Sequence, residues 1–180
     1  MPYTRWNENE IRIYKHTKHA SGLEAQAAAI AALAEEIWRE HFTPIIGEGQ
    51  VAYMLAKYQS ARQIFLDIKE NDYTYFTVDT KSDGLIGYCG VVPKEGYLLL
   101  SKLYIRRDFR GSGLARGFLN EATALCRSEY GLSKIRLTVN KHNHGPIAVY
   151  QKWGFETIES VKTDIGGGYF MDDYVMELSV

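Results

Sequence analysis

The chain has 180 residues, a length that predicts one domain over residues 1–180. Its composition, 46% hydrophobic and 24% charged residues, is typical of a water-soluble globular protein. Lys and Arg number 21 against 22 Asp and Glu, a balance that disfavours a nucleic-acid partner, because such a partner needs a basic excess on one face. No apolar run approaches the roughly 20 residues that span a bilayer, and residues 1–10 lack the apolar segment of a signal peptide, so we expect a cytoplasmic protein without a membrane partner.

The first half of the chain predicts a strand followed by helices. Residues 11–15 alternate as in a short strand, and apolar residues recur at helical spacing from Gly22 to His41. After a loop over 45–49 we expect a second helical region, from Gln50 to about Glu70. This region is expected to break near Ser60, because serine caps new helices.

The chain then changes to the composition of β-strands. Strands rich in β-branched and aromatic residues are expected over 73–78, 85–92 and 97–105, joined by turns at 81–84 and 93–96. Short turns connect neighbouring antiparallel strands, so the three strands are expected to lie side by side.

The last third predicts two helices among further strands. The apolar residues that follow Gly113 fall on one face of a helix, which we expect to pack on a sheet. The remaining elements are expected to be a strand over 135–140, a short helix opened by Pro146 and ending near Trp153, and strands over 157–162 and 169–178 after a flexible Gly166-Gly167-Gly168.

The residues that commonly bind metals do not form a site in this sequence. Cys89 and Cys126 belong to no CxxC pair, so we expect buried, inert thiols and neither a zinc site nor a redox motif. His142 and His144 lack cysteine or carboxylate ligands at a fitting spacing. We therefore expect no metal.

The stretch Arg110-Gly111-Ser112-Gly113-Leu114-Ala115 joins an expected strand to an expected helix. At such a junction, unpaired amides and the helix dipole hold a phosphate, and glycine lets the backbone approach the ligand closely. The stretch lacks the lysine and hydroxyl of a P-loop, and Arg116 stands where a dinucleotide-binding fingerprint has its third glycine. On its own, the stretch also fits an ordinary glycine turn and helix cap.

Two motifs together resemble the GNAT superfamily of acetyl-coenzyme A-dependent N-acetyltransferases. Arg110-x-x-Gly113-x-Ala115 resembles the family's R/Q-x-x-G-x-G/A pyrophosphate loop. The segment NHGPIAVYQKWGF, residues 143–155, resembles its N-x-x-A-x-x-x-Y-x-x-x-GF segment, with Pro146 in place of the usual alanine. Residues 43–55, 98–105 and 166–178 are also similar to a bacterial polyamine-acetyltransferase-like subgroup.

The resemblance implies an α/β (α+β) fold. A mixed, mostly antiparallel central sheet of about seven strands would contain a splayed parallel pair and be flanked by helices. The pantetheine arm of acetyl-coenzyme A would lie between residues 98–105 and 135–140. The implied cofactor contacts are backbone groups of Leu103, Tyr104 and Ile105, the loop residues Arg110, Gly111, Ser112, Gly113, Leu114 and Ala115, and Asn143 and Lys152 as secondary contacts, Lys152 fitting a solvated helix lysine as well.

The implied activity is transfer of an acetyl group from acetyl-coenzyme A, a co-substrate, to a primary amine of a small molecule or peptide, by direct attack in a ternary complex. Tyr150 would be the catalytic acid that protonates the departing thiolate, the alternative being a tyrosine that only packs a helix on the sheet. Many relatives carry a glutamate as the base before the pyrophosphate loop, but Ser101 and Leu99 occupy those positions here. The alternative function is an acyl-coenzyme A-binding sensor or structural module without transferase activity.

The amine acceptor is not specified by the sequence. His41 and Glu48 flank a region that lines the acceptor pocket in relatives, although each also fits an ordinary surface position. Asp172 and Asp173 would attract a cationic substrate, or simply face solvent. The late strands would supply an edge for a homodimer.

Overall fold

The computed structural model describes residues 11–180, so the expectation for residues 1–10 lies outside the described residues. The strands are β1 (Ile11–His16), β2 (Thr74–Thr80), β3 (Gly84–Lys94), β4 (Tyr97–Ile105), β5 (Lys134–Asn140), β6 (Glu156–Gly166) and β7 (Tyr169–Ser179). The helices are α1 (Leu23–His41), α2 (Thr43–Ile46), α3 (Glu48–Tyr58), α4 (Ala61–Glu70), α5 (Leu114–Ser128) and α6 (His144–Lys152), with a 3-10 turn at Arg107–Phe109.

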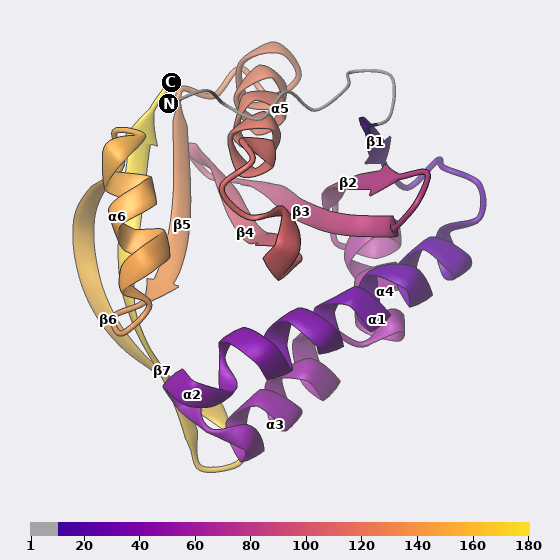
Figure 1. Ribbon diagram of the computed structural model, residues 1–180. Coiled ribbons are helices and arrows are strands. Elements are labelled where there is room, and N and C mark those ends of the chain that lie inside the picture. Colours follow the sequence, from indigo (N-terminus) through magenta and orange to yellow (C-terminus); the bar gives the residue numbers. More distant parts are fainter. Residues whose placement is uncertain (1–10) are drawn as a thin grey trace.

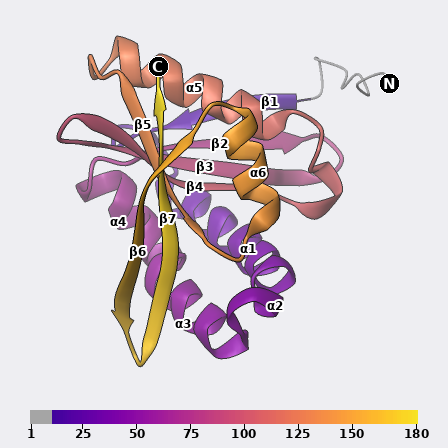
Figure 2. The ribbon, with the colours of Figure 1, turned by 90° about the vertical axis from the view of Figure 1, so that its left-hand side faces the viewer.

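Within the described residues, seven strands form one sheet in the order β1-β2-β3-β4-β5-β7-β6. β4 and β5 are parallel, and the other neighbours are antiparallel. Helices α1–α4 cover one face and α5 and α6 the other (Figure 1). The sheet is strongly twisted, since β5 and β7 cross the direction of β2–β4 steeply in Figure 2. The predicted fold class is confirmed.

Each face of the sheet carries its own apolar core. The core under α5 includes the fully buried Phe118 and Met176, and the core under α1 includes Ile30 and Tyr88. Side chains alternate between the two cores along the strands, because successive residues of a strand point to opposite faces. Cys89 and Cys126 are both buried and unpaired, as expected.

The helical half of the chain differs from the expectation at one loop. Residues 43–46 form the short helix α2 where a loop over 45–49 was expected, and α3 begins at Glu48. Pro44 stands in the first turn of α2, where its missing N–H leaves no hydrogen bond unmade. The expected break at Ser60 is confirmed, because the Ser60 hydroxyl accepts a hydrogen bond from the Gln63 amide at 3.3 Å and caps α4.

Two prolines lie inside elements that they were expected to border. Pro93 belongs to β3 and not to a turn over 93–96. The pairing of β3 with β2 ends at Val91, so Pro93 lies on a free edge, where a strand tolerates proline. α6 begins at His144, two residues before Pro146, because amides of a first helical turn need no partner within the helix.

The triple glycine makes an ordered hairpin between β6 and β7. Gly166 pairs with Tyr169, and Gly167 and Gly168 both have positive φ, 65° and 79°. This is the conformation of a two-residue hairpin turn, not of the flexible segment that was expected. The hairpin reaches α3 (Figure 2), where Tyr53 and Lys57 each donate a hydrogen bond to the carbonyl of Ile165 at 2.6 Å.

The parallel pair at the centre of the sheet is short. β4 pairs with β5 only at Leu98 with Ile135 and Leu99 with Arg136. Beyond these residues the two strands separate, and the space between them is called the β4–β5 gap below. A bulge in β4 follows, where Lys102 has a φ of 128°, a backbone conformation that is costly for any residue with a side chain.

A buried ion pair holds this bulge in place. The ammonium of Lys102 lies 2.9 Å from a carboxylate oxygen of Asp67 on α4, and both side chains are less than a tenth exposed. It also donates to the hydroxyl of Tyr75 at 2.6 Å and the carbonyl of Tyr58 at 3.1 Å. Burial lowers the pKa of Lys102, and the Asp67 charge opposes this. The strained residue is therefore fixed from three sides.

None of the helices among residues 11–180 has both the length and the apolar character needed to cross a lipid bilayer.

We expect Asp67→Ala to lower the free energy of unfolding by about 3–5 kcal/mol, because the Lys102 charge would stay buried without its partner. Urea denaturation measures this value. Glu35→Ala is the control, since it removes a solvent-exposed pair with Arg39 and should cost only about 0.3–0.5 kcal/mol. Equal effects of the two substitutions would contradict the role of the buried pair.

Candidate functional site

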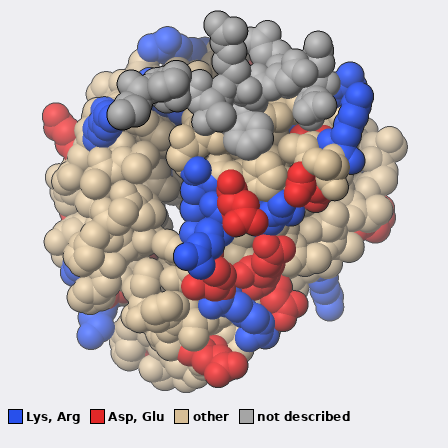
Figure 3. Space-filling view, viewed as in Figure 1, with Lys and Arg blue, Asp and Glu red and all other residues tan. Residues whose placement is uncertain are grey.

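The predicted backbone contacts lie where β4 leaves β5. Leu103, Tyr104 and Ile105 follow the last β4–β5 pair, so the edge of β4 that faces β5 makes no strand pairing there within the described residues. Figure 3 shows an opening through the molecule in this view, between the part with β5 and α6 and the part with β4 and α5. Lys and Arg side chains follow its edge. Backbone amides and carbonyls are thus available to an extended ligand.

The glycine loop leads from β4 into α5 with a special backbone conformation. Gly111 and Gly113 have positive φ, 75° and 91°, and Gly113 is the N-cap of α5 without a side chain to cap it. Ser112 donates its hydroxyl to the carbonyl of Phe109, which closes the preceding turn. The first amides of α5, at Leu114 and Ala115, have no acceptor within the helix. Together with the helix dipole, they form a place for an anion.

Arg110 fixes the loop with its side chain. Its Nε donates to the carbonyl of Ile105 at 3.0 Å, and its terminal nitrogen donates to Glu40 on α1 at 2.8 Å. Arg107 approaches the same carboxylate at 3.7 Å. The Ile105 carbonyl is therefore already engaged on one side. Sequence reasoning missed Glu40, because nothing distinguishes it there from the other charged residues on the exposed face of a helix.

Tyr150 extends from α6 among aromatic rings. Its ring centroid lies 5.9 Å from Trp153 and 5.7 Å from Phe155. Burial raises the pKa of Tyr150, so the phenol keeps its proton at neutral pH. Burial also raises the pKa of Tyr104 on β4, and the charges of Tyr150 and Asp173 add to this effect. Tyr104 is thus close enough to both Tyr150 and Asp173 to interact with them electrostatically.

Asn143 and His41, which sequence reasoning treated separately, are brought together. Asn143 is 7% exposed, and its side-chain oxygen accepts a hydrogen bond from His41 Nε2 at 2.9 Å. This contact joins the end of α1 to the start of α6. Lys152 is exposed on the last turn of α6, which fits a solvated lysine. Glu48 is exposed at the start of α3.

The adjacent residues Asp172 and Asp173 lie in different environments. Asp172 is partly exposed and forms an ion pair with Lys141. Asp173 is only 7% exposed and lies opposite Asn140, the last residue of β5. Burial, with a smaller effect of the Asp172 charge, raises the pKa of Asp173 to about 6. The sequence could not separate the two, since the difference arises from which face of β7 each one occupies.

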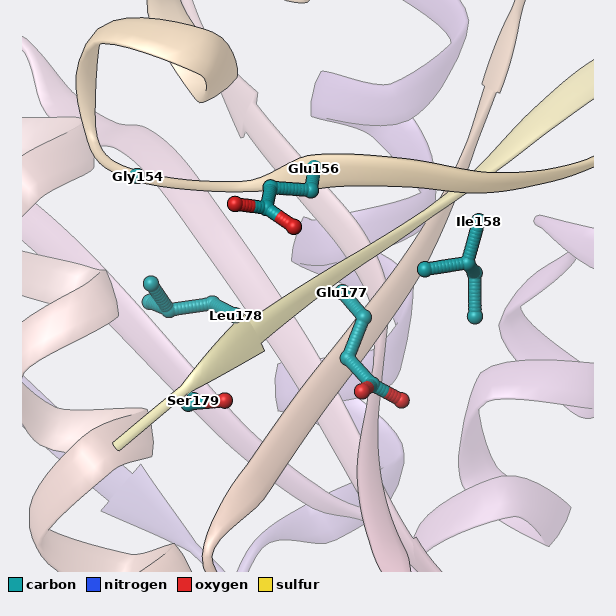
Figure 4. A pocket seen from close by; sticks show the side chains of 6 residues that line it. All are labelled: Gly154, Glu156, Ile158, Glu177, Leu178 and Ser179. Atoms are coloured by element: carbon teal, nitrogen blue, oxygen red, sulfur yellow. The ribbon is translucent and has the colours of Figure 1, made fainter.

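A shallow pocket elsewhere involves none of these residues. It is lined by Gly154, Glu156, Ile158, Glu177, Leu178 and Ser179 (Figure 4). Its carboxylate at Glu177 is already paired with Arg136 at 2.6 Å and Lys134 at 3.0 Å. Among residues 11–180, no three His, Cys, Asp or Glu side chains are placed to hold a metal ion.

Comparison with known proteins identifies relatives of the chain. The model of the acetyltransferase (GNAT) family matches residues 30–155. The chain is 28% identical over 90 residues to a Bacillus subtilis protein named "Putative ribosomal protein bS18-alanine N-acetyltransferase", an alignment that covers 50% of this chain and 59% of that protein. The chain thus spans about three fifths of the length of the curated relatives it matches.

Two solved structures share the arrangement of helices and strands. The PaiA N-acetyltransferase from Thermoplasma acidophilum, in complex with coenzyme A, is 20% identical, with a TM-score of 0.74 over 94% of this chain and 99% of that one. The spermidine/spermine N-acetyltransferase SpeG from Vibrio cholerae is 17% identical, with a TM-score of 0.62 over 96% of this chain and 95% of that one. At these identities, the similarity shows the fold.

We expect Gly113→Ala to lower the free energy of unfolding by about 1–2 kcal/mol, because a Cβ disfavours the left-handed conformation of the N-cap. No heavy atom lies within 4 Å of the added methyl group, so backbone strain alone sets this cost. Gly113→Asn should cost less, since asparagine tolerates this region. Gly145→Ala is the control, with open space and no positive φ, and it should be neutral or stabilising in the same denaturation experiment.

Proposed function

The chain belongs to the acetyltransferase (GNAT) family, and on that premise we propose that it transfers the acetyl group of acetyl-coenzyme A to a primary amine. The observation that carries this proposal is the pair of backbone sites that the chain leaves open, the edge of β4 from Leu103 to Ile105 that faces β5 and the uncapped start of α5. We propose that residues 1–180 act as one N-acetyltransferase domain in the cytoplasm.

The available groups fit the chemistry of coenzyme A. Pantetheine carries two amides, which would pair with the backbone from Leu103 to Ile105 as an added strand does. The pyrophosphate would accept hydrogen bonds from the amides of Gly111 to Ala115, where two glycines leave open space for a close approach. Asn143, whose side chain is hydrogen-bonded to His41, would contact the cofactor from the start of α6. Lys152, at the end of α6, would make a peripheral contact with it.

The proposed reaction is direct attack by the amine on the thioester. The amine nitrogen bonds to the carbonyl carbon, and backbone amides of β4 near Tyr104 stabilise the negative charge that develops on the oxygen. When the carbon–sulfur bond breaks, Tyr150 gives its proton to the thiolate. At neutral pH the Tyr150 phenol carries its proton, the form that a catalytic acid needs before the carbon–sulfur bond breaks.

We propose polyamines such as spermidine as the acceptor class. The overall similarity in fold to the spermidine/spermine enzyme supports this class. A buried carboxylate at Asp173 would favour a cationic acceptor. We also propose a homodimer formed along β6, since β6 is an edge strand and its Ile158 is 47% exposed.

Acetyl-coenzyme A is expected to stabilise the protein by about 2.7 kcal/mol at a concentration of 100 times Kd, because it binds the native state. Thermal denaturation measures this effect.

We expect Tyr150→Phe to keep the same thermal shift but to lower kcat by about 10²–10⁴-fold, because the acid is lost while the binding groups remain. Release of free thiol with a panel of amines measures kcat, with the partly exposed Tyr14→Phe as the control.

Absence of a thermal shift at saturating acetyl-coenzyme A would refute the proposed cofactor site. A shift without thiol release for any amine would instead support the acyl-coenzyme A sensor. Unchanged turnover in Tyr150→Phe would remove Tyr150 from the role of acid.

A further inference from the structure

We propose that Asp173 is the general base of the reaction, the carboxylate that receives the ammonium group of the acceptor and takes its proton. This inference rests on the proposed transfer to an amine. It assigns a role that β4 leaves open, because Ser101 and Leu99 are not acids. A base is required, since an amine with a pKa of about 10.4 is almost fully protonated at neutral pH.

Asp173 lies at the end of the β4–β5 gap. On β7 it is opposite Asn140, far along β5 from the last pair with β4 at Arg136. It occupies the face of the sheet that α1–α4 cover, as Met171 two residues before it does. Tyr104 belongs to the same face, within 6.0 Å of the Phe42 ring. The carboxylate is therefore near the part of β4 that would hold the thioester.

The Asp173 carboxylate has no partner of its own. Among residues 11–180, no ion pair or side-chain hydrogen bond reaches it, whereas the adjacent Asp172 is paired with Lys141. A carboxylate that is 7% exposed and unpaired is unfavourable for the fold. A cationic ligand would remove this penalty by pairing with it. This largely buried carboxylate, which has no ion-pair partner among residues 11–180, is the observation that indicates an ammonium site.

The acid and the base approach from opposite faces of the sheet. Tyr150 packs with the core under α5 and α6, and Asp173 lies on the face of α1–α4. Tyr104, beside the gap, interacts electrostatically with both. In the addition step, the attacking nitrogen and the leaving sulfur lie on different sides of the carbonyl carbon. A base on the acceptor side and an acid on the sulfur side match this arrangement.

The titration of Asp173 suits this role. Its pKa is raised to about 6, first by burial and then by the charge of Asp172, while Lys141 lowers it. On β4, the Asp173 charge raises the pKa of Tyr104, which burial already raises, so Tyr104 is neutral. At neutral pH, most Asp173 is ionised. Its pKa lies closer to the operating pH than the pKa of an exposed carboxylate does, which suits a general base.

The protons balance as follows. The ammonium pairs with Asp173 and gives it one proton as the nitrogen–carbon bond forms. The second proton leaves the nitrogen as the tetrahedral intermediate collapses and replaces the one that Tyr150 gives to the thiolate. The products are the amide, coenzyme A as a thiol, and one proton, which Asp173 releases to solvent.

The test is the pH dependence of kcat/KM for wild type and Asp173→Asn, with spermidine and a panel of simple primary amines as acceptors. We expect wild type to gain activity through about pH 6 and then level off. Asp173→Asn should lose about 10²–10⁴-fold at neutral pH. Its residual rate should rise tenfold per pH unit with the fraction of free amine.

Asp172→Asn is the matched control on the same strand. It removes a charge that raises the pKa of Asp173 and frees Lys141, so the acidic limb should move to lower pH while the plateau stays. A purely structural role for Asp173 would not predict this shift.

A second measurement separates function from folding. Because the pKa of Asp173 is raised in the native state, ionisation destabilises the fold as pH rises from 3.8 through about 6. Asp173→Asn is therefore expected to melt above wild type at neutral pH, with a difference that vanishes below pH 3.8. It should also keep the thermal shift with acetyl-coenzyme A.

The outcomes distinguish the two proposals. If wild type binds no acetyl-coenzyme A or acetylates no amine, the proposed function fails and this inference falls with it. If wild type is active and Asp173→Asn keeps both its rate and its acidic limb, only the assignment of Asp173 fails. Loss of activity together with loss of acetyl-coenzyme A binding would also overturn it, because the effect would then be structural.

Discussion

The separation of β4 from β5 after Leu99 is the constraint on which the site depends. A sheet normally satisfies its backbone by pairing every strand, and here the central pair stops after two residues. The bulge at Lys102 redirects β4, and a buried ion pair with Asp67 holds that strained residue. The ion pair thus stabilises a strained bulge in β4, beyond which the edge of β4 that faces β5 makes no strand pairing among the described residues.

The elements that could be predicted from the sequence were those specified by local chemistry. Ser60 capped a helix as expected, and Gly113 took the left-handed conformation that a glycine at a helix start allows. The misplaced elements contained proline or glycine whose effect depends on neighbours. Pro93 entered a strand because its edge was free, and Gly167 made a tight turn. Local propensity does not contain this information.

From the sequence, only residues that belong to motifs could be proposed as members of the candidate site. The positions from Arg110 to Ala115 and Tyr150 carry a recognisable spacing, but the partner of Arg110, Glu40, comes from 70 residues earlier in the chain. Asp173 becomes distinct from Asp172 only through the register of β7 with β5. Burial then raises the pKa of both Tyr150 and Asp173, although the roles proposed for them require one to keep a proton and the other to accept one.

Three contacts close the molecule into a ring around the opening seen in Figure 3. The first is the strand pairing of β4 with β5 that ends at Leu99, and the second is the hydrogen bond between His41 and Asn143. The third consists of the hydrogen bonds from α3 to the Ile165 carbonyl near the tip of the β6–β7 hairpin. A ring closed at three points has no single hinge about which its two sides could open. In the proposed ternary complex, both substrates would therefore have to fit together in an opening that the fold already contains.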